Sequence, residues 1–220
     1  MKRRTLDIIF SIGGVVFSLL LLVAGLILTN QSNFAKTYVR DQLTAQKITF
    51  TPGEFLSDVE KGATCLVKYG GTPLDSGKKA ECYANEYIAL HMAESATAAG
   101  YDGATYATMG DVLRGENGLA AQLKAAKEAG TATEEIQAKL DAANGLRGTL
   151  LTGETLRGLL LTSYGFSVFG DRAGQAALVC YAAAVVLFLL SLAGLFHAFF
   201  SKHSKDVLLV AEHPTPEPTA

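Results

Sequence analysis

The feature that most constrains this chain is an uncharged, apolar run at residues 8–29. A helix of this length extends for about 33 Å, enough to cross a hydrocarbon core of roughly 30 Å. A cleaved signal peptide is the alternative, but its apolar region is only about 7–15 residues long. Neither a small-x-small cleavage site nor a lipoprotein cysteine follows the run. We therefore expect an uncleaved transmembrane helix at residues 8–29, after a cytoplasmic N-terminus at 1–7.

A second apolar run at residues 175–200 is also long enough to cross a bilayer, and only His197 within it could carry a charge. Basic residues lie on the terminal side of each run, namely Lys2, Arg3, Arg4, Lys202 and Lys205. The positive-inside rule then places both termini in the cytoplasm and residues 30–172 outside it. The lipid bilayer is thus an expected partner, and we expect His197 to snorkel towards the inner interface.

Small residues at a spacing of four recur in both runs. Gly14 with Ser18, and Gly194 with Ala198, are such pairs. They allow close contact between the two helices, although pairs of this kind are also common by chance.

The region between the runs has the periodicity of helices. We expect the first helix to continue outward over residues 33–48 and to end at a Pro-Gly breaker. Further helices are expected at 54–69, 76–98, around 111–114, at 119–128, and after Thr131, which has capping-box spacing to Glu134. The predicted fold is therefore all-α, with two transmembrane helices flanking an extracytoplasmic helical domain of residues 30–172. The alternating prolines of residues 201–220 predict a disordered cytoplasmic tail.

Residues 144–170 are mostly apolar but are interrupted by glycines, so we do not expect a third span. The segment is either the central helix of the domain, with its end at the membrane interface, or a helix lying on the membrane surface. We favour the first. Glu154 and Arg157 form either a surface ion pair or a buried structural one. We predict a docking or interfacial face that contains Glu154, Arg157, Tyr164, Phe166 and Phe169.

Two of the three cysteines lie outside the predicted spans. Cys65 and Cys82 are about equally far from a turn expected at Pro73 or Leu74, so an antiparallel hairpin would place them opposite each other. A disulfide can persist outside the cytoplasm. A metal pair would lack further ligands. We therefore predict a disulfide between Cys65 and Cys82 and a packing role for Cys180.

Motifs for catalysis or cofactor binding are not found. His91 is the only external histidine, and a lone histidine on a helix stripe is typical of a structural residue. The segment 153–158 has Leu159 where a phosphate-binding loop requires a lysine. A net charge of −2 without basic clusters argues against nucleic-acid binding. We expect no metal, no cofactor and no enzymatic activity.

Three stretches, residues 34–50, 76–92 and 146–166, resemble a family of small bacterial two-span membrane proteins of unknown function. Members of that family are often labelled aromatic-ring-opening dioxygenases. The resemblance implies the two-span topology and a location in the bacterial plasma membrane. It transfers no active site, because an iron dioxygenase needs histidine and carboxylate ligands that one external histidine cannot supply. The pair Cys65 and Cys82 is not part of the family pattern.

Two functions fit these expectations. The first is a non-enzymatic scaffold or accessory subunit that binds a membrane-protein partner, another envelope component or further copies of itself. The second is an extracytoplasmic ligand-sensing domain. Its cytoplasmic segments are too short to hold an output domain, so sensing would require a partner subunit.

Overall fold

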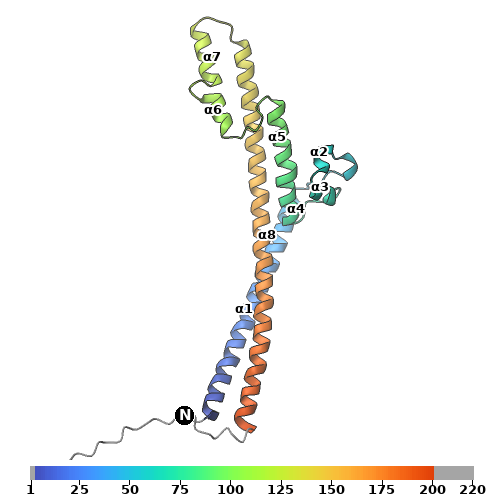
Figure 1. The fold of residues 1–220 in the computed structure, drawn as a ribbon, viewed down its shortest axis with the longest axis vertical. Helices are drawn as coiled ribbons and strands as arrows, with labels where there is room; N and C mark the ends of the chain where they lie inside the picture. Colours follow the sequence, from blue (N-terminus) through green and yellow to red (C-terminus); the bar gives the residue numbers. More distant parts are fainter. Residues whose placement is uncertain (1–2, 201–220) are drawn as a thin grey trace, which may run out of the picture. The chain divides into compact units, whose positions relative to one another are not determined.

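The computed structural model describes residues 3–200, and this part of the chain is helical without a β-strand (Figure 1). It divides into two compact units. One unit contains the described residues 3–34 and 170–200, and the other contains residues 35–169. Two long helices contribute to both units, α1 (Arg3–Ala45) and α8 (Glu134–Phe200). The predicted tail at 201–220 lies outside the described residues.

In the first unit, small residues separate α1 from α8. A side chain at Gly14 would collide with Ser191, and one at Gly194 would collide with Ser11. Ser11, Ser191 and Ala198 are buried between the helices. The close contact expected from the small-residue pairs is therefore present, and it has the composition of helix interfaces within membranes.

Polar side chains also meet between α1 and α8 in this unit. Thr29 Oγ1 lies 2.9 Å from Tyr181 Oη, and His197 Nδ1 lies 2.9 Å from Asp7 Oδ2. The sequence predicted that His197 would snorkel towards the inner interface, and the structure adds a carboxylate partner for it on α1.

The large apolar side chains of the first unit point outward. Phe10, Leu20, Leu178 and Leu190 are among those that are well exposed. Both helices are long and apolar enough to cross a membrane, and they contain the runs predicted from the sequence. Each helix is much longer than a bilayer is thick, since 43 and 67 residues correspond to about 65 and about 100 Å.

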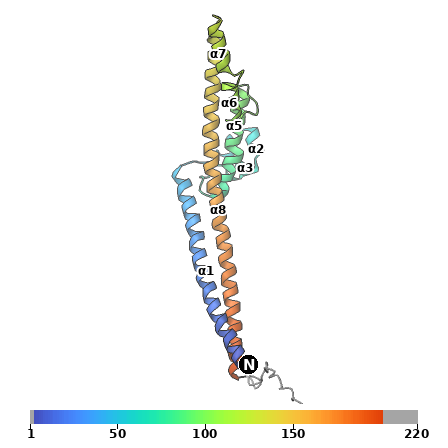
Figure 2. The ribbon, with the colours of Figure 1, turned by 90° about the vertical axis from the view of Figure 1, so that its left-hand side faces the viewer.

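The second unit is built from short helices packed along α8 (Figure 2). In chain order these are η1 (Gly53–Phe55), α2 (Asp58–Lys61), α3 (Thr64–Tyr69), α4 (Gly77–Cys82), the π-helical η2 (Tyr83–Ile88), α5 (Ala89–Ala98), α6 (Thr108–Arg114) and α7 (Leu119–Glu128). The helix predicted at 119–128 is confirmed with these bounds.

Two hydrophobic cores hold the second unit together. The first joins α1, α3, α4 and η2 to α8 around Phe50, Leu66, Leu74 and Leu160. The second joins α5, α6 and α7 to α8 around Met109, Leu113 and Leu150. Residues 144–170 thus contribute to both cores, as the central-helix alternative requires.

After α1 the chain turns at Lys47, which has a φ of 55°. The next residues run extended beside the segment before α4. The Leu74 N–H donates to Ile48 O at 2.9 Å, and the Phe50 N–H donates to Thr72 O at 3.0 Å. These backbone bonds fix the position of the α3–α4 connection.

Three expectations were wrong in detail. The single helix predicted at 54–69 is divided, because Ser57 caps a new helix and Gly62 ends it. The Thr131 hydroxyl donates to Ala126 O at the end of α7, so it does not cap α8. The glycines of residues 144–170 do not interrupt α8, which runs continuously from Glu134 to Phe200.

Candidate functional site

A groove with a volume of about 710 Å³ lies between η2 and α5 on one side and α8 on the other. One wall is a ladder of rings at a spacing of four residues. The rings of Tyr83 and Tyr87 are stacked, with their centroids 4.6 Å apart. The rings of Tyr87 and His91 meet edge to face, with their centroids 4.3 Å apart. The other wall consists of small side chains of α8, including Gly148, Thr149, Thr152 and Gly153. The groove can therefore accept an elongated and largely uncharged group.

Tyr83 forms the inner end of this ladder. Its ring also meets Phe50 edge-on at 5.3 Å, which fixes it against the first core. Burial, together with the nearby Tyr87, raises the pKa of Tyr83 to about 12. Its hydroxyl therefore stays protonated at neutral pH.

His91, at the outer end of the ladder, lies between two carboxylates. Its Nε2 is 3.3 Å from Glu60 Oε1, and its Nδ1 is 3.2 Å from Glu94 Oε2. Glu60 is buried and forms a capping box with Ser57, whose N–H donates to Glu60 Oε2 at 2.7 Å. This backbone hydrogen bond holds the pKa of Glu60 below its usual value, and His91 lowers it further. The Nε2 contact with Glu60 lies within ion-pair distance but lacks hydrogen-bond geometry, so His91 packs α5 next to α2 without a hydrogen bond between them.

Arg157 connects α8 to the π-helical turn. Its Nε donates to Ala84 O at 3.1 Å, and its Nη1 donates to Glu154 Oε1 at 2.8 Å. The side chain of Arg157 is only 24% exposed, while that of Glu154 is half exposed. The sequence left open a surface ion pair or a buried structural one. The observed pair lies between these alternatives, because it is partly buried and connects α8 to η2.

Lys78 and Gly77 bring the start of α4 onto α8. Lys78 Nζ donates to Tyr164 Oη at 3.2 Å. This hydrogen bond raises the pKa of Lys78, and the hydrogen bond to Glu81 raises it further. A Cβ atom at Gly77 would lie 3.3 Å from the Tyr164 Cα and would collide with Ser167. Only a glycine allows this approach without a shift of the helices.

The five residues predicted as one docking face do not share a side of α8. Arg157 and Tyr164 point to η2 and α4, whereas Phe166 meets the ring of Tyr38 on α1 at 5.9 Å. Phe169 is 76% exposed. At 100° per residue, positions 157 and 164 fall almost opposite position 166, so the helical period already separates them.

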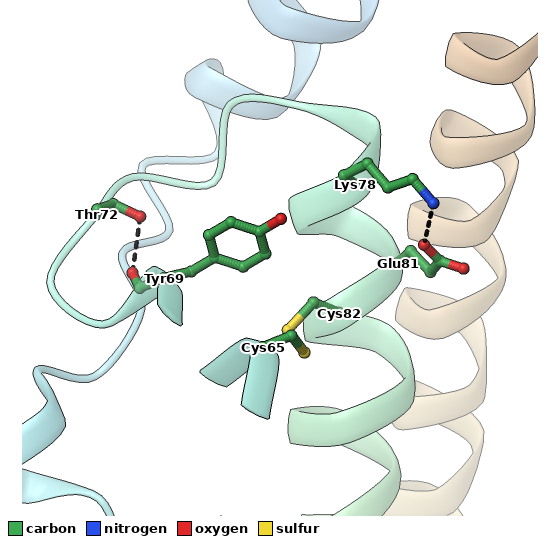
Figure 3. Close-up of a disulfide and its surroundings, with 6 residues drawn as sticks. All are labelled: Cys65, Tyr69, Thr72, Lys78, Glu81 and Cys82. Atoms are coloured by element: carbon green, nitrogen blue, oxygen red, sulfur yellow. Dashed lines mark hydrogen bonds and ion pairs between the residues drawn. A yellow bond between two sulfur atoms is a disulfide. The ribbon is translucent and has the colours of Figure 1, made fainter. Parts of the chain in front are cut away.

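The cysteine pair lies at the junction of α3 and α4 (Figure 3). Cys65 and Cys82 are joined in a disulfide, with Cα atoms 6.1 Å apart. The ring of Tyr69 points toward α4 beside it, and the Thr72 hydroxyl donates to Tyr69 O at 2.7 Å. The disulfide and the extended pairing near residue 72 hold the same connection. Cys180 is a free, half-buried cysteine.

One further surface was singled out from the sequence only at its end, through Phe169. We call it the open face of α8, and it consists of Leu151, Thr155, Gly158, Leu159, Thr162 and Phe169. On one side it borders α1, because Leu159 and Thr162 also line a crevice with Tyr38 and neighbouring residues of that helix. Leu151 and Leu159 are 46% and 63% exposed. The hydroxyls of Thr155 and Thr162 donate to the carbonyls of Leu151 and Gly158, at 2.7 and 2.8 Å. The threonines therefore present mainly methyl groups to the outside.

The open face carries no charge. Between residues 148 and 170 the only charged side chains are Glu154 and Arg157, which bond to each other and, through Arg157, to η2. A Cβ atom at Gly158 would meet nothing within 4 Å. The spacing of uncharged residues by three and four could have indicated this surface, but the same pattern also fits a buried helix.

Within the described residues, no group of three or more His, Cys, Asp or Glu side chains is placed to hold a metal ion. Comparison of the chain with family models, with curated proteins and with solved structures finds no match. The function is therefore inferred from the groove, the open face and the two apolar helices.

Proposed function

We propose that this protein is a two-span protein of the bacterial plasma membrane that acts as a scaffold or accessory subunit rather than as an enzyme. Its second unit, residues 35–169, would lie outside the cytoplasm and bind another membrane or envelope component. The observation that carries the proposal is the open face of α8, an apolar and uncharged surface on a regular helix.

The physical argument is the free energy of leaving this face in water. Burial of apolar surface is worth about 25 cal/mol per Å². Leu151, Leu159 and Phe169 are exposed, and the threonine hydroxyls between them are already bonded. A contiguous apolar surface of this kind is typical of an interaction site.

Lipid is a less suitable cover for the open face. A membrane span needs about 20 residues of helix. The apolar segment at residues 175–200 of α8 already supplies them, so residues 151–162 would lie beyond the bilayer and only Phe169 would come near its surface. The Cys65–Cys82 disulfide supports an extracytoplasmic location of the second unit, since such bonds persist in oxidising compartments.

The test is co-purification of the full chain from membranes in mild detergent. Leu159→Glu places a charge on the open face, and Ala125→Glu places the same charge on an exposed position of α7. We expect a stoichiometric component, either a second copy or another protein, to be lost at least fivefold with Leu159→Glu and retained with Ala125→Glu. Equal recovery with both variants, or no stoichiometric component with the wild type, would contradict the proposal.

Ligand sensing is the second candidate, and the groove of about 710 Å³ favours it. Thr152→Phe would fill the groove from the α8 side. Native mass spectrometry of the purified wild type should then show a bound small molecule that Thr152→Phe lacks. Identical spectra would remove this candidate.

A further inference from the structure

We propose that the open face of α8 is covered by the same face of a second copy of this chain, with the two α8 helices parallel about a two-fold axis. This inference rests on the proposed function and names the partner of that surface. It follows from orientation, charge and spacing.

Orientation comes from the two apolar helices. Because each chain would cross the same bilayer in the same sense, two neighbouring copies present α8 in the same direction. Closed two-fold pairing of identical surfaces is the commonest arrangement of soluble homo-oligomers. In a parallel pair, each residue of the open face lies close to its own copy.

Charge decides which surfaces can pair in this way. A charged residue on a parallel two-fold interface would face an identical charge, which is unfavourable. The open face satisfies this requirement because Glu154 and Arg157 are held together and Arg157 is bonded to Ala84 on another side of the helix. A partner with a charged surface would gain nothing from this face.

Spacing fits a pair of parallel helices. Leu151, Thr155, Gly158 and Thr162 follow each other by four, three and four residues, and Phe169 follows Thr162 by seven. This is the seven-residue period that keeps one stripe of a helix facing its partner. The open space at Gly158 allows the two backbones to approach closely.

The small contact area between the two α8 helices determines where the dimer can form. Nineteen residues of helix are about 29 Å long, and a contact strip about 10 Å wide gives on the order of 300 Å² per copy. A standard interface buries about 800 Å² per partner. The contact therefore depends on the bilayer, which confines both copies in one orientation and raises their effective concentration.

The test is cysteine cross-linking of the full chain in membranes. In a Cys180→Ala background, Thr155→Cys and Thr162→Cys each place a thiol on the open face. Thr149→Cys places one on the groove side of the same helix, turned away from Thr155 by about 120°. All three positions are exposed, and Cys65 and Cys82 stay in place.

With a mild oxidant, we expect Thr155→Cys and Thr162→Cys to give at least five times more disulfide-linked dimer than Thr149→Cys on non-reducing gels. Adding Leu159→Glu to Thr155→Cys should lower the dimer at least fivefold. Equal dimer from all three positions would indicate random collision and would overturn the inference.

The outcomes separate this inference from the proposed function. In one outcome, no dimer forms at Thr155 or Thr162, but a different protein still co-purifies and is lost with Leu159→Glu. A second copy is then not the partner of the open face, and the scaffold proposal stands. If neither a dimer nor another component depends on the open face, both are wrong.

Discussion

At the scale of single residues, Glu60 combines a structural and an electrostatic role. It is buried, completes the capping box of α2 and contacts His91 of α5. Because the folded protein stabilises the charged carboxylate, chiefly through the Ser57 N–H, the pKa of Glu60 lies below its ordinary value of 4.5. The position of α2 should therefore depend on pH.

The sign of this dependence follows from the direction of the shift. The contribution of Glu60 to stability is present above the unfolded pKa of 4.5 and is lost as the pH falls through the lowered folded pKa. We expect Glu60→Gln to be less stable than the wild type at neutral pH and to lose less stability on acidification to about pH 3. Thermal unfolding at a series of pH values measures this. Glu94→Gln, at the exposed carboxylate on the same histidine, should keep the wild-type pH profile.

Gly77 is a second residue with a specific requirement. Gly77→Ala would force α4 away from α8, because the new Cβ would meet Ser167 and the Tyr164 backbone. We expect a loss of about 1–3 kcal/mol in the free energy of unfolding, as for other overpacked sites. Gly110→Ala in α6, where a Cβ meets nothing within 4 Å, should be neutral or stabilising. A lower melting temperature for both variants would contradict this account.

At the scale of elements, the π-helical η2 was not predictable from the sequence. The stripe of Tyr83, Tyr87 and Leu90 indicated a helix at 76–98, and the structure has one, but a π turn leaves no clear mark on such a pattern. Arg157 of α8 donates to the carbonyl of Ala84 within this turn, a tertiary contact that the local sequence does not reveal. π turns are often found at functional sites, and this one borders the groove.

Local signals predicted other elements well. Both ends of α7 and the disulfide between Cys65 and Cys82 followed from periodicity and spacing. Capping was less predictable, because the Thr131 hydroxyl bonds to the end of α7 instead of to the start of α8. The groove could not be predicted, since its two walls are 53 or more residues apart in the chain.

Arg157→Lys tests the link between α8 and η2. A lysine has no planar fork, so it cannot bond to Glu154 and to the Ala84 carbonyl with the same geometry. We expect a loss of about 1–2 kcal/mol in the local opening free energy, measured by amide hydrogen exchange over residues 83–98. Arg114→Lys, at an exposed position of α6, should leave exchange in that segment unchanged. Faster exchange in both variants would point to a general loss of stability instead.

At the scale of the whole molecule, the membrane topology is the prediction on which the proposed function depends. A membrane-impermeant maleimide applied to intact cells should label Ala125→Cys in α7 and should fail to label Lys205→Cys. Both cysteines should react after the cells are opened, which controls for accessibility. Labelling of Lys205→Cys in intact cells would reverse the proposed orientation of the tail.

The threonines of the open face have a consequence for how such chains are compared. Hydropathy scales count threonine as a hydrophilic residue, yet here each hydroxyl is satisfied within its own turn of helix. Valine has nearly the same shape, so exchange between the two would alter the apparent polarity of the stripe while leaving its outline unchanged. A comparison of sequences that scores the hydropathy of each residue separately would therefore miss this surface.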